Sequence, residues 1–180
     1  MIRSLFFALL GMAIIPLYAQ EQKWQLNTQK SEITYAANHM LHGWKGINNN
    51  IRGVLVVNPE SMQLKEIAVL ALVRDFDSNN DGRDAHALEV LEALSYPEVR
   101  FYSNVIENQE NALLINGVLD FHGVKKNTTI EVRQKNKDDQ LVLSGTFEIK
   151  PSMYEVPLPS FMMVKMDDIL TFDFKLEFGP

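Results

Sequence analysis

A regular alternation of apolar and polar residues constrains this chain more than any other feature of its sequence. After Ile169, Leu and Phe occupy every second position of residues 170–178, and Thr, Asp, Lys and Glu stand between them. Successive side chains of a β-strand point to opposite faces, so this period predicts a strand with one buried face. Similar runs occur near residues 33–39, 51–57, 99–105, 113–121, 128–132 and 141–149, and residues 67–73 are almost continuously apolar. The sequence therefore predicts about eight strands and an all-β fold.

Short polar turns separate these strands, for example at residues 108–111 and 136–140. Short connections join antiparallel neighbours, because parallel strands need a long crossover. Strands with one apolar face form a barrel or a sandwich, and a closed sheet also removes exposed edges. We find no repeat or interdomain linker, so residues 20–180 are expected to form a single domain.

One segment has helical spacing instead. From Arg83 to Ser95, apolar residues recur on one helical face, at Leu88, Val90, Leu91 and Leu94. Asp81 or Asp84 could cap the N-terminus, and Tyr96-Pro97 ends the helix because the residue before proline disfavours helical geometry. This single short helix in a strand connection is expected to cover one end of the sheet.

Residues 1–19 have the pattern of a secretory signal peptide. Arg3 precedes an apolar run from Leu5 to Ile15, and Pro16 stands just before a cleavage pattern that ends at Ala19. The run is short against the roughly 20 residues needed to span a bilayer, so a transmembrane anchor is the weaker alternative. We expect a periplasmic or secreted protein after cleavage.

Charge and cysteine content exclude several functions. The 180-residue chain has no Cys, a formal net charge of −6 and a pI near 5.2. Absence of Cys excludes a disulfide scaffold, thiolate metal sites and a cysteine nucleophile. The acidic balance argues against nonspecific binding of nucleic acid.

Histidines and carboxylates are the candidates for a metal or catalytic site. His39 and His42 are spaced so that they point to opposite faces of a continuous strand, and they converge only if the chain turns between them. Gly43, which favours a turn, follows His42 and so lies slightly too late in the chain to bring the two histidines together. Residues 77–84 are rich in carboxylates but lack the bidentate glutamate that an EF-hand loop requires at its twelfth position. We interpret them as a polar connection between strand and helix, and we expect no metal.

The interior of the predicted sheet is the remaining candidate site. An eight-stranded barrel is just wide enough to be filled by side chains or to hold one small ligand. Small residues on the apolar faces would leave space, namely Ala37, Ser103, Gly117 and Gly145. A filled core is the alternative.

Ordered motifs run along the chain, namely residues 24–27 with 31–35, His39-Met40, Gly53, residues 80–86 with Arg83, Asp84 and His86, residues 96–103, and residues 117–125. In this order they resemble the YceI-like family of exported polyisoprenoid-binding proteins. After residues 147–149 the chain departs from the commonest family pattern. A proline-broken, Met-rich loop at residues 157–166 follows there, with flexible apolar residues suited to adaptable binding surfaces.

The resemblance implies an eight-stranded antiparallel, lipocalin-like barrel around a tunnel. It implies a non-catalytic periplasmic carrier or store for an isoprenoid or other amphiphilic lipid, without a cofactor. The tunnel wall would be formed by Tyr35, Ala37, Phe101, Leu119, Phe121, Phe147, Phe172 and Phe174. Arg83, Asp84 and His86 would form a polar motif near one end of the barrel.

Two other functions are compatible with the sequence. A filled barrel could act as a protein-interaction module of the cell envelope, with the loop at 157–166 as its contact surface. A metal-dependent hydrolase using His39, His42 or His86 has weaker support. The sequence leaves the ligand's identity and the oligomeric state open, with a dimer among the alternatives.

Overall fold

The computed structural model describes residues 21–137, 139–161 and 163–180. The predicted signal peptide therefore lies outside the described residues. Helical segments are η1 (Thr28–Lys30), η2 (Val73–Asp75), α1 (Asp81–Val90) and η3 (Pro151–Tyr154). The strands are β1 (Gln22–Leu26), β2 (Glu32–His39), β3 (His42–Asn48), β4 (Arg52–Asn58), β5 (Gln63–Leu72), β6 (Glu98–Asn108), β7 (Leu113–Phe121), β8 (Val124–Lys137), β9 (Gln140–Ile149), β10 (Ser160–Phe161), β11 (Val164–Lys165) and β12 (Leu170–Gly179).

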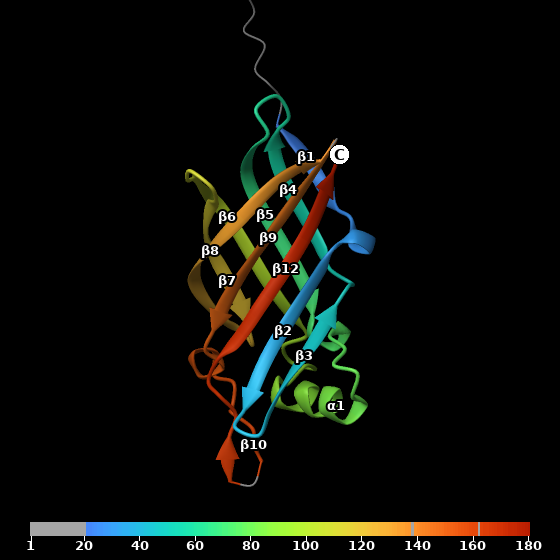
Figure 1. The fold of residues 1–180 in the computed structure, drawn as a ribbon, viewed down its shortest axis with the longest axis vertical. Helices are drawn as coiled ribbons and strands as arrows, with labels where there is room; N and C mark the ends of the chain where they lie inside the picture. The colour runs from blue at the N-terminus through green and yellow to red at the C-terminus, as the bar shows by residue number, and fades with distance from the viewer. Residues whose placement is uncertain (1–20, 138, 162) are drawn as a thin grey trace, which may run out of the picture.

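The strands close into an eight-membered antiparallel ring in the order β1, β4, β5, β6, β7, β8, β9 and β12 (Figure 1). The ring closes where β1 pairs with the end of β12, with Leu26 opposite Phe178. The first half of β12 pairs with β2 instead, with Ala37 opposite Leu170. β1 and β2 therefore act as one bent strand that is interrupted by η1. The predicted eight-stranded antiparallel barrel is confirmed.

The barrel widens at one end because β3 separates from β5, the strand that pairs with β4. β4 pairs with β5 from Arg52 to Asn58, whereas the backbone of β3 meets the later chain at a bridge between Ile47 and Asp77. η2 and α1 occupy the gap that results, beside β3 (Figure 1). The β10–β11 hairpin extends from the same end, and β1 and the C-terminus lie at the opposite end. The two ends of the barrel thus differ in construction.

The tightest packing lies in the half that β1 and β4 close. Residues with no exposed surface gather there, among them Ile51, Leu55, Val57, Leu141, Leu143 and Phe178. Full burial of each such side chain stabilises the fold by about 1.5–3 kcal/mol. Around the wide end, many apolar side chains are only half-buried. The closed half is therefore the main stabilising core.

The observed helix begins and ends earlier than the sequence predicts. Its N-cap is Asn80, whose side chain accepts a hydrogen bond from the Arg83 amide at 2.9 Å, so neither Asp81 nor Asp84 is the cap. Asp84 binds Ser78 instead. The helix stops at Val90, and Glu92 adopts a left-handed φ of 44°. That turn directs Leu94, predicted on the apolar face, fully into solvent.

Candidate functional site

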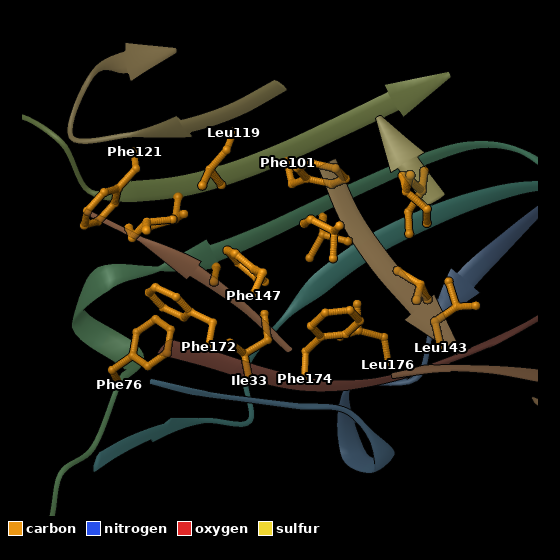
Figure 2. Close-up of a pocket in the computed structure, with 18 residues that line it drawn as sticks. Ile33, Phe76, Phe101, Leu119, Phe121, Leu143, Phe147, Phe172, Phe174 and Leu176 are labelled. Atoms are coloured by element: carbon orange, nitrogen blue, oxygen red, sulfur yellow. The ribbon is translucent and has the colours of Figure 1, made fainter. Parts of the chain in front are cut away.

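An entirely apolar compartment lies inside the barrel. Its volume is about 90 Å³, and every residue that lines it is apolar. Figure 2 shows side chains from β2, β6, β7, β9 and β12 converging on this space, together with Phe76 from the connection before α1. Six of the eight predicted wall residues line this inner compartment, namely Phe101, Leu119, Phe121, Phe147, Phe172 and Phe174.

A larger compartment follows at the wide end of the barrel. Its volume is about 470 Å³, within the range of roughly 300–1,000 Å³ typical of small-molecule sites. Phe76, Val99, Phe121 and Phe172 line both compartments, so the two are adjacent. The other two predicted wall residues, Tyr35 and Ala37, line this outer compartment.

Aromatic rings occupy the space that two interior glycines leave. A Cβ atom on Gly117 would lie 2.5 Å from the Phe101 ring, and one on Gly145 would lie 2.9 Å from the Phe174 ring. Gly145 is directly opposite Phe174 in the β9–β12 pairing. The prediction that these glycines leave room for a ligand is therefore wrong, because each gives its room to a neighbouring ring.

The other two small residues have different roles. Ser103 lies at the bulge of β6, where its hydroxyl donates to the Asn116 carbonyl at 2.7 Å and accepts from the Val105 amide at 3.0 Å. It satisfies backbone groups and does not line either compartment. Ala37 is buried and forms part of the outer wall, so of the four small residues it alone borders the cavity.

Phenylalanine rings stack beside the boundary of the two compartments, where Phe172 lines both. The rings of Phe147 and Phe172 lie opposite each other on β9 and β12, with centroids 5.2 Å apart and planes within 14°. Phe174 tilts against Phe147 at 6.3 Å. Rings held in this way present an apolar, polarisable surface to whatever fills the passage.

The predicted polar motif of α1 borders the outer compartment. Arg83, Asp84 and His86 all line it. The Arg83 guanidinium carbon lies 5.7 Å from the centroid of Trp44, a cation–π contact between α1 and β3. Asp84 accepts hydrogen bonds from the Ser78 hydroxyl at 2.5 Å and from the Ser78 amide at 3.2 Å. These contacts hold the helix against the wide end of the barrel.

Tyr35 lines the outer compartment together with this motif. Its ring packs edge-on against Phe76 at 5.6 Å and covers Gly46, where a Cβ atom would lie 2.2 Å from the ring. Burial raises the pKa of the Tyr35 phenol, and the negative charge of Asp84 adds to the rise. The phenol is therefore a neutral hydrogen-bonding group at physiological pH, placed where an apolar wall becomes polar.

The two histidines of the β2–β3 hairpin lie side by side. The chain turns at Met40-Leu41, earlier than Gly43, and the rings of His39 and His42 stand 6.0 Å apart. His39 Nε2 donates to the Val164 carbonyl at 3.0 Å, and its Nδ1 accepts from the Leu41 amide at 3.3 Å. Both His39 nitrogens thus have structural partners. Within the described ranges, no group of three or more His, Asp or Glu residues could hold a metal ion.

Sequence reasoning missed Phe76 as a site residue. Phe76 lies in the connection between η2 and α1, where no strand or helix period marks it. Its position follows from the bridge between Ile47 and the adjacent Asp77, which holds this connection against β3. A single Phe inside an otherwise polar connection was the only signal in the sequence.

A search for membrane-crossing helices over the described part of the chain finds none of sufficient length and apolar character.

Comparison with known proteins agrees with this architecture. The YceI-like domain family matches residues 24–178. A UPF0312 protein of Vibrio parahaemolyticus is 29% identical over 136 residues, which cover 72% of each chain. BcnA of Burkholderia cenocepacia has the same fold, with a TM-score of 0.76 at 18% identity over 84% of this chain and 98% of BcnA. A polyisoprenoid binding domain from Saccharophagus degradans aligns with a TM-score of 0.69 at 12% identity, over 87% of this chain and 97% of that domain.

Proposed function

Because the chain belongs to the YceI-like family, we propose that it binds an isoprenoid or other amphiphilic lipid chain inside its barrel. The observation that carries this proposal is the pair of adjacent compartments, of which the inner one is lined by apolar residues alone. The polyisoprenoid binding domain of Saccharophagus degradans has a similar fold, which supports this class of ligand. An open cavity favours a binding protein over a filled barrel that acts only through its surface.

The chemistry of the two compartments supports one orientation of the ligand. A polar group without a hydrogen-bond partner is costly in the inner compartment, so the hydrocarbon chain occupies it. The polar head lies in the outer compartment, where Tyr35, Arg83 and His86 offer hydrogen-bonding groups. Phe172 and Val99 surround the chain where it passes between the compartments.

The mechanism is burial without chemistry. Each methylene group transferred from water into the cavity contributes about 0.8 kcal/mol, and part of that gain offsets the ordering of the chain. The protein acts as a carrier or store that keeps an insoluble chain out of water. The predicted leader at residues 1–19 supports a role in the periplasm or outside the cell.

Native mass spectrometry of the purified full chain tests the binding proposal. We expect a bound lipid or, after delipidation, uptake of added farnesol and longer prenols. Phe76→Asp places a carboxylate against both compartments without altering a barrel strand, and it should abolish uptake. Tyr102→Asp, on the exposed outer wall, is the matched control and should bind as the wild type does. A wild-type protein that neither carries nor takes up any prenol would refute the proposal.

A further inference from the structure

Two hairpin tips at the wide end of the barrel expose large apolar side chains. Met40 and Leu41 form the β2–β3 turn and are 72% and 59% exposed. Met163 forms the β10–β11 turn and is 99% exposed. We call these three residues the apolar tips. Flexible, unbranched or singly branched side chains of this kind adapt to irregular apolar surroundings.

The apolar tips stand directly beside the mouth of the cavity. His39 and His42, which flank the first tip, line the outer compartment. Ser160 and Met166, on either side of the second tip, line it as well. Both tips therefore adjoin the wall of the outer compartment.

Hydrogen bonds join the two hairpins into one unit. The His39 side chain donates to the Val164 carbonyl at 3.0 Å, and the Asp167 amide donates to the Asn38 carbonyl at 2.9 Å. Both bonds lie within a few residues of the tips. The apolar tips are thus held at the rim together, as a fixed pair.

The turns at the opposite end of the barrel are polar rather than apolar. Its described turn residues, near 58–62, 108–112 and 137–140, include none of the exposed large apolar side chains. They carry Glu60, Glu110 and Asp139 instead. Exposed apolar turns are therefore a property of the mouth end and not of the turns in general.

The charges around the tips fit a lipid surface. Residues 39–45 and 160–166 contain no Asp or Glu in a chain that has 23 of them, and each segment contains one lysine. Lys45 and Lys165 are both exposed. The exposed Asp167 directly follows the second segment. Apolar side chains next to the two lysines suit the headgroup region of a bilayer that contains anionic lipid.

We propose that the apolar tips insert into the surface of a lipid bilayer and place the cavity mouth against it. This inference rests on the proposed function, because it supplies the path by which a lipid enters the barrel without crossing water. Insertion of a few side chains gives weak, reversible attachment, as a carrier that must leave again requires. Lys45 and Lys165 contact the phosphate groups around the inserted tips.

The test compares two variants of the full chain. The tip variant combines Met40→Ser, Leu41→Ser and Met163→Ser. The wall variant combines Tyr102→Ser, Val105→Ser and Val118→Ser, which remove exposed apolar side chains from the side of the barrel. All six positions are exposed, so both variants should keep the wild-type melting temperature.

Three measurements separate the two proposals. Association is measured by cosedimentation with vesicles of phosphatidylethanolamine containing a minor share of phosphatidylglycerol. Transfer is the rate at which long prenol leaves those vesicles for the protein. Cavity binding is measured with geraniol, which is short enough to be supplied from solution.

We expect the tip variant to lose at least about tenfold in vesicle association and transfer rate, and to bind geraniol normally. The wall variant should match the wild type in all three measurements. Equal association of the tip variant and the wild type, or no association of the wild type, would overturn the inference while leaving the proposed function intact. Tip-dependent self-association without vesicle binding would also overturn it. Failure of the wild type to bind any prenol would instead refute the proposed function.

Discussion

Blocking the passage between the two compartments should shorten the chain that the protein can bind. Val99 of β6 lines both compartments and lies opposite Ala71 of β5 in the barrel wall. A Val99→Trp substitution places an indole ring in the passage. Overpacking of this kind costs about 1–3 kcal/mol of unfolding free energy, which the closed core of the other half should tolerate.

The lost binding energy follows from the volume of the inner compartment. Its 90 Å³ accommodates about three methylene groups, if each takes about the volume of one water molecule, ~30 Å³. At about 0.8 kcal/mol per methylene, the blocked compartment forfeits about 2.4 kcal/mol. Since 1.4 kcal/mol corresponds to a factor of ten, the variant should bind a long chain about 50-fold more weakly.

A series of straight-chain alcohols of increasing length measures this effect by calorimetry. Wild-type affinity should rise with length until both compartments are filled, and Val99→Trp should reach its plateau about three methylenes earlier. Val118→Trp makes the same substitution on the outer wall and should follow the wild-type curve. If Val99→Trp and the wild type bind the whole series equally, the inner compartment is not part of the ligand site.

Three further substitutions test individual contacts at the wide end. Gly46→Ala forces the Tyr35 ring to move and should lower the unfolding free energy in urea by about 1–3 kcal/mol, whereas Gly82→Ala, with no atom closer than 3.5 Å, should not. Asn80→Ala removes the cap of α1, worth about 1 kcal/mol, and should speed both amide exchange in the helix and lipid release; unchanged rates would argue against a covering role. Burial raises the pKa of Tyr35 in the folded state above the value of 10.0 for a free tyrosine. The contribution of the protonated phenol to the unfolding free energy is therefore complete below pH 10.0 and is lost as the pH rises through the folded pKa. Tyr35→Phe should therefore lose less stability than the wild type between about pH 9 and pH 11, and parallel losses would contradict this assignment.

The barrel itself could be predicted because its signal is local. In β12, Phe172, Phe174 and Leu176 line the inner compartment, as their shared parity predicts. The apolar run at residues 67–73 was ambiguous by pattern, because both of its faces are apolar. Pairing resolves it: Val69 lies opposite Phe101, and both face the cavity.

The details of the site depend on contacts between distant segments, which a period cannot reveal. Whether Gly145 leaves a space depends on its register with Phe174. The two residues are 29 positions apart in sequence but directly opposite each other on the paired strands β9 and β12. The cap at Asn80 was missed because two nearby aspartates offered equally good chemistry. The roles of the predicted wall residues in ligand binding stay predictions, although their positions around the cavity are now known.

Substitutions in the sealed half of the barrel and in its wide half have different consequences for this chain. Substitutions at Ile51, Leu55 or Phe178, which have no exposed surface, lower the stability of the fold. Substitutions around Tyr35 or Val99 alter the shape of the cavity and leave that core untouched. Ligand preference can therefore diverge between relatives, or be redesigned in the laboratory, without the barrel having to be stabilised afresh each time.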